Sequence, residues 1–423
     1  IKGKKTDGHK FVKKAIQKGA IKCITRQKVN EISKNKIIKV KNTLHALNKL
    51  AKVTRSITSA QIIGITGSVG KTTLKNLVGF ALGNYGKIYH SPHSYNNKFG
   101  VPLSICNLKK DINYGVFEIG MDKKGEIDYL SKLVRPEIAT ITNITGAHFK
   151  NFNSLNDIAK AKAEIIKNIS PGGTIILNKD DNFFNFFNEQ AKKLKINIVS
   201  YSQNKKANIH LLGIKKTKNV FRLKISVNNE FFYFNTKNCT NSFLSNILAC
   251  ISILSTMKLD LKKIENKFIK FIVPDGRGDI KVVHKYGKKF KFIDESYNAN
   301  PLSMLSAIRN MNSYKRKNKS KKIVFLGDML ELGKKSKKLH KELSKVINRS
   351  NIDKVFVYGK YIKETFDRLY TNKKGKIFSN LNEANRHFSN IINNNDLLMI
   401  KGSNATGLNQ FSKNIKRKQI SVI

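Results

Sequence analysis

The sequence predicts an α/β protein made of three successive segments, and three observations lead to this fold class. At 423 residues, 40% of them apolar, the chain is long enough for more than one hydrophobic core. Between residues 58 and 273, apolar runs typical of strands alternate with amphipathic helical patterns, as in a parallel sheet covered by helices. The same alternation returns in residues 274–423, whereas residues 1–57 are short and mixed.

The central segment contains the clearest elements. Apolar runs predict strands at Gln61 to Thr66, Val116 to Ile119, Ile138 to Ile144 and Thr174 to Leu177. A helix is expected after the first strand, where Leu74, Leu77, Val78 and Ala81 recur at helical spacing. A second helix should begin at Ser154, because Asp157 completes a capping-box pattern, and should reach about Ile169. Alternating apolar residues on either side of Asn228-Asn229 predict a hairpin between residues 220 and 234.

The third segment repeats this rhythm with buried strands at Ile323 to Leu326, Val355 to Tyr358 and Leu397 to Ile400. The first two end at Gly327 and Gly359, which suits a turn at the carboxyl edge of a parallel sheet. Ligands bind at that edge in open α/β sheets. We therefore expect part of a binding site there.

The net charge raises the question of a nucleic-acid partner. The formal charge is +53, and a basic surface is typical of phosphate binding. However, only 11 of the 81 basic residues are Arg, and Lys is spread along the chain with Asn and Ile, which share A/T-rich codons. We therefore attribute the charge to nucleotide bias and expect no nucleic-acid partner.

Two further features of the sequence concern membrane spans and the N-terminal segment. No apolar run approaches the roughly 18 residues that a membrane-spanning helix needs, and no charged-then-apolar leader opens the chain. We therefore expect a cytoplasmic protein without a membrane span. Because the chain opens on Ile1-Lys2-Gly3 without an initiator Met, we also expect that its N-terminal segment is truncated.

A glycine-rich loop lies between the first strand and the first helix of the central segment. It reads Gly64-Ile65-Thr66-Gly67-Ser68-Val69-Gly70-Lys71-Thr72-Thr73. Glycines let backbone N–H groups approach phosphate oxygens, and the helix N-terminus adds partial positive charge. Lys71 would neutralise the phosphates of ATP, and Thr72 would bind Mg²⁺. The strict pattern fails at Ile65, which replaces a glycine, so this is a variant phosphate loop.

Other candidate residues give weaker signals. Glu118 and His148 follow strand ends, where they could reach Mg²⁺ near the phosphate loop, although an exposed carboxylate or loop histidine would look the same. Lys162 has the sequence context of a solvated lysine on a helix. Residues 296–301, Ser-Tyr-Asn-Ala-Asn-Pro, have the composition of a turn, although their amides could also contact an adenine.

Taken together, these strings resemble the Mur ligases over nearly the whole chain. The resemblance is carried by the phosphate loop and by Asn96-Asn97, Glu118-Ile119-Gly120-Met121, Ala147-His148, Ala161-Lys162, Asp294 to Pro301, Gly327 to Gly333 and Lys401-Gly402-Ser403. The resemblance implies a small N-terminal α/β domain for a UDP sugar, a central ATP-binding domain and a Rossmann-like C-terminal domain for an incoming dipeptide. It also implies an ATP-dependent amide ligase of peptidoglycan precursor synthesis.

The resemblance also assigns roles to individual residues. It implies that ATP is bound by Gly67, Ser68, Val69, Gly70, Lys71, Thr72, Thr73, Asn298 and Asn300. Magnesium would be held by Thr72, Glu118, His148 and a carbamylated Lys162. Catalysis would use Lys71, His148, Lys162 and Arg277, and the substrates would contact Asn97, Asp328, Glu331 and Lys401. The implied substrates are UDP-N-acetylmuramoyl-tripeptide and D-alanyl-D-alanine, and we expect a monomer.

The sequence differs from the family's motifs at two places, and two alternative functions remain. Thr240-Asn241-Ser242-Phe243 replaces a Gly-Arg-His-Asn string of the family, and Asn404 replaces an Arg. A sister ligase similar to folylpolyglutamate synthetase is one alternative, which the string from Tyr297 to Pro301 disfavours. A nucleic-acid-binding ATPase is the other, and it would be expected to carry Arg-rich patches with exposed aromatic residues.

Overall fold

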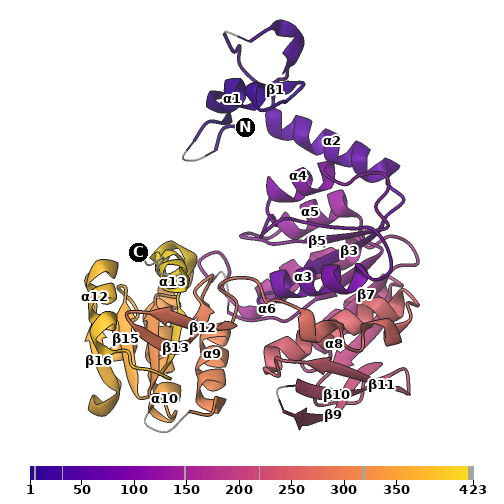
Figure 1. The fold of residues 1–423 in the computed structure, drawn as a ribbon. Helices are drawn as coiled ribbons and strands as arrows, with labels where there is room; N and C mark the ends of the chain where they lie inside the picture. Colours follow the sequence, from indigo (N-terminus) through magenta and orange to yellow (C-terminus); the bar gives the residue numbers. More distant parts are fainter. Residues whose placement is uncertain (4–5, 31, 147–148, 219, 317–319, 418–423) are drawn as a thin grey trace.

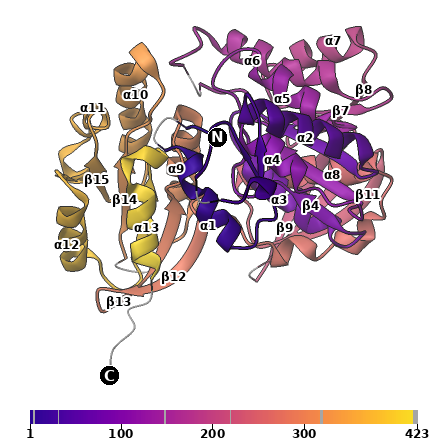
Figure 2. The same ribbon diagram turned by 90° about the horizontal axis from the view of Figure 1, so that it is seen from above.

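A computed structural model describes the chain from residue 1 to 423, except for residues 4–5, 31, 147–148, 219, 317–319 and 418–423. Figure 1 shows a small N-terminal part above a large central domain, with the C-terminal domain beside the central one. From above, the N-terminus and helix α1 lie over the junction of the two larger domains (Figure 2). The predicted α/β class with three successive parts is confirmed.

The central domain is built on one mixed sheet, whose described strands follow the order β11-β10-β9-β8-β7-β6-β3-β5-β4. Strands β3 to β9 pair in parallel, and β9, β10 and β11 form an antiparallel extension. The strands are β3 (Gln61–Thr66), β4 (Ile88–His90), β5 (Tyr114–Glu118), β6 (Ile138–Ile141), β7 (Thr174–Asn178), β8 (Asn197–Ser202), β9 (Ile209–Thr217), β10 (Val220–Val227) and β11 (Glu230–Thr236). The predicted hairpin is β10–β11.

Helices cover both faces of this sheet. One face carries α4 (Gly100–Cys106), α5 (Glu126–Val134), α6 (Leu155–Ala163) and α7 (Phe184–Lys193), and the other carries α3 (Lys71–Leu82) and α8 (Asn241–Thr256). Strand β3 is buried on both sides: Ile62 packs into the first core, whereas Ile63 and Ile65 pack into the second. This arrangement follows from the alternation of side chains along a strand that is covered by helices on both faces.

Three predicted boundaries are corrected. Strand β5 spans Tyr114–Glu118 rather than Val116 to Ile119, and β6 ends at Ile141 rather than Ile144 because the chain then turns to support the phosphate loop. The helix from Ser154 has the predicted capping box but ends at Ala163, and a 3₁₀ turn follows over Glu164–Asn168. There the carboxylate of Glu164 accepts hydrogen bonds from two backbone N–H groups at the start of α5.

The C-terminal domain has a second sheet, with the order β12-β13-β17-β14-β15-β16 among the described residues. All neighbours pair in parallel except β12 and β13. Its strands are β12 (Asp279–Lys285), β13 (Lys288–Glu295), β14 (Lys322–Gly327), β15 (Lys354–Tyr358), β16 (Lys374–Ile377) and β17 (Leu397–Lys401). Its helices are α9 (Pro301–Ser313), α10 (Ser336–Asn348), α11 (Lys363–Phe366), α12 (Leu381–Ile391) and α13 (Leu408–Lys416).

The N-terminal part contains α1 (Val12–Gln17) and a parallel pair of short strands, β1 (Cys23–Thr25) and β2 (Ile37–Lys39). Helix α2 (Thr43–Ile57) connects it to the central domain. Ala51 of α2 lies in the same hydrophobic core as α4 and α5, and Arg55 donates to the carbonyl oxygen of Val134 at 2.7 Å. The last part of the segment 1–57 therefore packs on the central domain.

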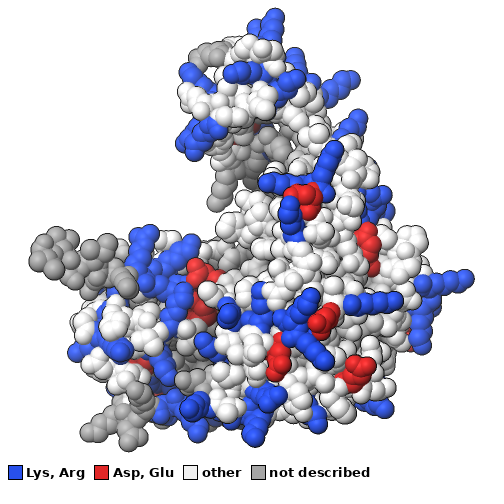
Figure 3. Space-filling view, turned by 45° about the vertical axis from the view of Figure 1, so that its right-hand side comes forward, with Lys and Arg blue, Asp and Glu red and all other residues white. Residues whose placement is uncertain are grey.

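Basic side chains are distributed widely over the surface. In the view of Figure 3, Lys and Arg residues are scattered over the N-terminal, central and C-terminal parts, with few acidic residues among them. This pattern matches the even spread of Lys along the sequence. In the part of the chain that the structure describes, none of the helices combines the length and apolarity that crossing a bilayer requires.

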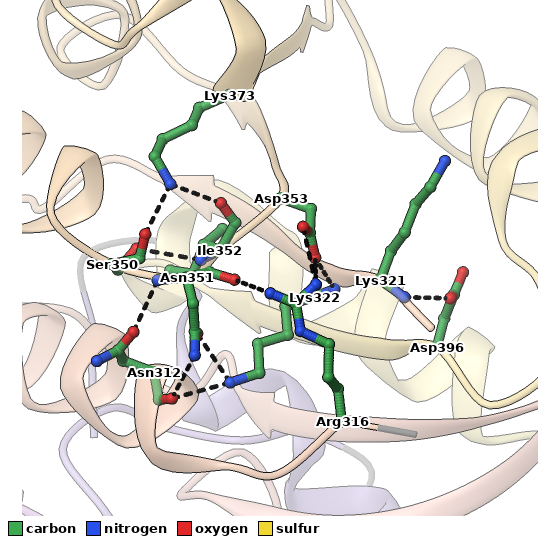
Figure 4. Close-up of polar contacts among 10 residues, drawn as sticks. All are labelled: Asn312, Arg316, Lys321, Lys322, Ser350, Asn351, Ile352, Asp353, Lys373 and Asp396. Carbon is green, nitrogen blue, oxygen red and sulfur yellow. Dashed lines mark hydrogen bonds and ion pairs between the residues drawn. The ribbon is translucent and has the colours of Figure 1, made fainter. Parts of the chain in front are cut away.

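Buried lysines also form hydrogen bonds at the amino edge of the C-terminal sheet (Figure 4). At the start of β14, Nζ of Lys322 donates to the carbonyl oxygen of Asn312, near the end of α9, and to Oδ1 of Asn351. Lys373 donates to two carbonyl oxygens of the loop before β15, both at 2.8 Å. Cations are favourable near helix C-termini, where carbonyl groups lack partners. These lysines stabilise the fold, because their Nζ atoms donate hydrogen bonds to oxygen atoms of the protein.

Candidate functional site

A cavity of about 1430 Å³ lies between the domains and brings most of the predicted residues together. The central domain contributes the phosphate loop, Glu118 and Lys162, and the C-terminal side contributes Arg277 and Lys401. Glu118 and Lys401 are the last residues of β5 and β17, both strands with parallel partners. The cavity therefore lies at the carboxyl edges of two sheets, where open α/β proteins bind ligands.

The phosphate loop needs its glycines. Gly67 and Gly70 adopt φ angles of 140° and 89°, which disfavour other residues. A Cβ atom on Gly67 would lie 1.9 Å from Oγ1 of Thr142, so this position also has no room for a side chain. Ile65, the departure from the strict pattern, is a fully buried residue of β3, before the loop leaves the sheet. The variant loop thus retains small residues where the backbone turns.

Lys71 and Thr72 begin α3. Nζ of Lys71 donates to the carbonyl oxygens of Gly67 and Ser68 at 2.8 and 3.3 Å, and burial lowers the pKa of this amine. Oγ1 of Thr72 donates to Oε2 of Glu118 at 2.7 Å. The first turn of α3 therefore places Lys71 in the field of a carboxylate on the neighbouring strand and hydrogen-bonds Thr72 to that carboxylate.

Glu118 offers oxygen atoms of the kind that Mg²⁺ binds. The side chain is buried, and besides Thr72 it accepts a hydrogen bond from Nδ2 of Asn96 at 2.7 Å. A carboxylate and a hydroxyl oxygen thus converge, which fits a hard divalent cation. Within the described residues, no three His, Cys, Asp or Glu side chains form a metal-binding group. His148, the other predicted ligand, lies outside the described residues.

Lys162 is buried beside the phosphate loop, with 1% of its surface exposed. Its Nζ donates to the carbonyl oxygen of Gly67 at 3.0 Å, the same oxygen that Lys71 contacts. Burial and then the charge of Lys71 hold the pKa of Lys162 well below its ordinary value. The sequence context indicated a solvated lysine, whereas α6 directs the side chain of Lys162 into the site.

The C-terminal side of the cavity carries two cations. The guanidinium of Arg277 stacks over the ring of Tyr297, 4.1 Å from its centroid, and Nη2 lies 3.3 Å from Oγ of Ser94. Lys401 is 2% exposed, pairs with Glu295 at 3.3 Å and donates to the carbonyl oxygen of Asn298 at 3.1 Å. Both cations thus lie where a negatively charged ligand in the cavity would meet them.

The remaining predicted residues have clear local roles. Asn300 caps helix α9, where its side chain accepts a hydrogen bond from the backbone N–H of Ser303. Asn97 accepts hydrogen bonds from the N–H groups of Phe99 and Gly100 at the start of α4. Asn97 and Glu331 both line the cavity. Asp328 is not among the described residues that line the cavity. Its carboxylate accepts three backbone N–H groups of residues 360–362 and fixes the loop after β14.

Lys75 is a residue of this region that the sequence analysis missed. It is fully buried, and its Nζ donates to the carbonyl oxygens of Ser91 at 2.6 Å and of His93. Burial lowers its pKa to about 8. Lys75 holds the turn that leads to Ser94, whose hydroxyl lies 3.3 Å from Oγ1 of Thr72. Its position four residues after Lys71, on the same helix face, was the available signal.

Asn143 also escaped notice, although it supports the loop directly. Its Oδ1 accepts from the N–H of Val69 at 3.0 Å, and its Nδ2 donates to the carbonyl oxygen of Val69 at 3.1 Å. Thr142 donates to the same carbonyl at 2.6 Å. The segment after β6 therefore holds the phosphate loop from one side. Two polar residues after a strand were the only sequence signal for this role.

Comparisons with known proteins agree with this geometry. The Mur ligase middle domain matches residues 65–254, and the Mur ligase glutamate ligase domain matches residues 280–404. The chain is 33% identical over 405 residues to the UDP-N-acetylmuramoyl-tripeptide–D-alanyl-D-alanine ligase of Rickettsia prowazekii, covering 96% of this chain and 89% of that protein.

Solved structures give the same result for the fold. A MurF crystal structure from Acinetobacter baumannii superimposes with a TM-score of 0.85 at 25% identity, covering 99% of this chain and 90% of that one. MurF from Thermotoga maritima in complex with ADP has a TM-score of 0.81 at 24% identity, covering 98% and 93% of the two chains. The resemblance inferred from the motifs is confirmed: the chain belongs to the Mur ligase family, among the UDP-N-acetylmuramoyl-tripeptide–D-alanyl-D-alanine ligases.

Proposed function

We propose that this chain joins D-alanyl-D-alanine to UDP-N-acetylmuramoyl-tripeptide while ATP is converted to ADP and phosphate, a step of peptidoglycan precursor synthesis. The observation that carries the proposal is the meeting of Lys71, Thr72, Glu118 and Lys162 at the central-domain wall of a cavity whose C-terminal wall holds Arg277 and Lys401. The first wall suits ATP, and the second suits negatively charged reacting groups. The names of the relatives supply the two substrates.

The reaction proceeds in two steps. The terminal carboxylate of the tripeptide attacks the γ-phosphorus of ATP, the bond to the β-phosphate oxygen breaks, and an acyl phosphate and ADP result. The neutral amine of D-alanyl-D-alanine then attacks the acyl carbonyl and loses a proton as the amide bond forms, while the C–O bond to phosphate breaks and phosphate leaves. Lys71 and the N–H groups at the start of α3 bind the phosphates, and Arg277 and Lys401 approach the transferring group from the other wall.

Magnesium fits the oxygen atoms of Thr72 and Glu118, and it would neutralise negative charge on the phosphates of ATP. In this proposal Asn96 orients the carboxylate of Glu118 through its hydrogen bond, as supporting residues do around metal ligands. His148 remains a predicted third ligand. Asn298 and Asn300 would contact the nucleotide, and Asn97 and Glu331 the substrates, since all four line the cavity. Asp328 would act on the substrates through the loop it fixes.

We also propose that Lys162 is carbamylated. The neutral amine attacks CO₂, a C–N bond forms, and one proton is released, which leaves an anionic carbamate. This change would place a negative charge beside Lys71, whose Nζ contacts the same carbonyl oxygen of Gly67. It would also add an oxygen ligand of the kind that Mg²⁺ prefers. The lowered pKa of Lys162 supports the proposal, because only the neutral amine reacts.

The setting of the reaction completes the proposal. Both ATP and a UDP-linked precursor are cytoplasmic metabolites, so we place the enzyme in the cytoplasm. We propose a monomer, because the cavity receives contributions from all parts of one chain, including Lys2 and Gly3 of the N-terminal part. The boundaries near residues 57 and 273 remain proposals for the limits of the three domains.

A substrate panel tests this function. The enzyme with ATP and Mg²⁺ is offered UDP-N-acetylmuramoyl-tripeptide with D-alanyl-D-alanine, or a folate with L-glutamate, and the products are identified by mass spectrometry. We expect the pentapeptide product in the first reaction and no extended folate in the second. Glutamate addition to the folate, without pentapeptide formation, would favour the sister ligase instead.

A further inference from the structure

Phe149 lies between the hydrophobic cores of the central and C-terminal domains. Its half-buried ring packs against the central core that includes Ile144 and Phe152, and also against the C-terminal core that includes Met329 and Leu332. A side chain that packs against two cores favours one relative position of the two domains. Phe149 also directly follows the predicted metal ligand His148 in the chain.

Polar contacts join the same two segments. The backbone N–H of Lys150 donates to the carbonyl oxygen of Glu331 at 2.8 Å. Nζ of Lys335 donates to the carbonyl oxygen of Asn153 at 3.0 Å, and it lies 4.1 Å from the centroid of the Phe149 ring. The lysine thus combines a hydrogen bond with a cation–π contact. We call these segments, residues 149–153 and 329–335, the interdomain latch.

The C-terminal half of the latch is firmly attached to the cavity wall behind it. Asp328 accepts three backbone N–H groups of residues 360–362, at 2.7 to 2.9 Å. The N–H of Leu330 donates to Oγ of Ser403 at 2.9 Å, and this serine closely follows Lys401 at the end of β17. These hydrogen bonds connect the latch loop to the end of β17, where Lys401 lies.

We propose that Phe149 and Lys335 are positioning residues, which set the distance between the phosphate loop and the wall that carries Lys401. This inference rests on the proposed function, because it assigns the latch to the transfer between ATP and the acceptor. Misplacing reacting groups by about 1 Å can lower a rate on the order of 10²-fold. A loosened latch would also admit water to the acyl phosphate, so that ATP is consumed without ligation.

The test compares Phe149→Ala and Lys335→Ala with Lys334→Ala, a control at an exposed lysine of the same loop. For each variant we would measure kcat, ADP affinity, melting temperature and the ratio of phosphate released to pentapeptide formed. We expect kcat to fall about tenfold or more in Phe149→Ala and less in Lys335→Ala. The ratio should rise above one in both, ADP affinity should stay within about twofold, and Lys335→Arg should restore the ratio.

Hydrogen exchange provides a measurement that needs no substrate. The peptide that covers residues 149–153 should exchange faster in Lys335→Ala than in Lys334→Ala, because the N–H of Lys150 is protected by the latch. If Phe149→Ala does not fold, the exposed Lys335 decides the question. Kinetics, ratio and exchange equal to those of Lys334→Ala would overturn the latch. A wild-type enzyme that is inactive with these substrates, but shows the exchange difference, would contradict the proposed function and leave the latch contact supported.

Discussion

At Lys162 the protein buries an amine beside a second amine, on the same carbonyl oxygen of its phosphate loop. Burying an amine costs free energy unless the charge is lost or compensated. The proposed carbamate would remove the titratable amine and would place an anion near Lys71. In this proposal, the unfavourable burial of Lys162 favours the modification that the site would use.

Replacing Lys162 by Ala should lower kcat on the order of 10²-fold or more, because a charged group near the transferring phosphate is lost. A small carboxylate such as acetate should restore part of the activity by occupying the vacated space. Lys160→Ala, at an exposed lysine of the same helix, serves as the control and should keep normal turnover. Near-normal activity of Lys162→Ala would refute the role, and a dead variant that no carboxylate rescues would contradict the carbamate.

The buried amine of Lys75 should change how the free energy of unfolding depends on pH. Its native amine loses a proton near pH 8, whereas the unfolded chain does so near the ordinary value of 10.5. Between these values the unfolded state binds more protons, so the stability of the wild type rises with pH. Relative to Lys75→Met, the free energy of unfolding should increase by roughly 3 kcal/mol across this range.

Urea titrations at several pH values measure this difference. An exposed lysine of α2 provides the matched control, and Lys52→Met should differ from the wild type by an amount that is nearly independent of pH. A pH-independent difference between Lys75→Met and the wild type would show that the amine of Lys75 keeps an ordinary pKa in the folded protein.

Among the elements, the phosphate loop has the strictest requirement for its shape. Gly67→Ala would bring a Cβ atom to 1.9 Å from Oγ1 of Thr142, at a φ of 140°. We expect a loss of stability of roughly 2 kcal/mol or more and at least tenfold weaker ADP binding. Calorimetric titration with ADP and urea unfolding measure both effects.

Gly172→Ala is the control for backbone strain alone. Gly172 has a φ of 74° and no atom within 4 Å of the added Cβ, in a turn before β7. This variant should lose about 1 kcal/mol of stability and bind ADP normally. If Gly67→Ala behaves like this control, the loop does not hold the phosphates in the way we describe.

The sequence predicted those elements whose burial produces a clear pattern. Strand β3 was found because both of its faces are apolar, and helix α3 was found because one of its faces is apolar. The end of α6 was misplaced, since a 3₁₀ turn continues the same apolar spacing. Glu118 and the phosphate loop were placed at the site by their strand ends, whereas the roles of Lys75 and Asn143 depend on carbonyl and N–H groups of distant residues.

For the whole molecule, the position of the domains was beyond prediction from the sequence. The contacts of Arg277 with Ser94 and of Lys335 with Asn153 join residues that are far apart in the chain. Such contacts leave no periodic pattern, because single side chains make them. The motifs revealed that the residues belong to one site, and the structure supplied the latch that holds its walls together.

The charge of +53 should act only on long-range association. Lys and Arg are scattered in the view of Figure 3. On this face, DNA would therefore be attracted by a diffuse positive potential and not by a concentrated basic patch. Any binding should be weak and should collapse between roughly 50 and 200 mM salt, as release of counterions requires. Fluorescence anisotropy with labelled DNA measures it, and tight binding that survives this salt would revive the nucleic-acid alternative.

Phosphate release with substrates omitted one at a time tests the central claim most directly. With ATP and Mg²⁺, we predict rapid release only when UDP-N-acetylmuramoyl-tripeptide and D-alanyl-D-alanine are both present, with one pentapeptide formed per phosphate. Without D-alanyl-D-alanine the rate should fall to slow hydrolysis of the acyl phosphate. Rapid phosphate release that needs neither substrate, or that requires DNA instead, would contradict the assignment of this chain as a ligase.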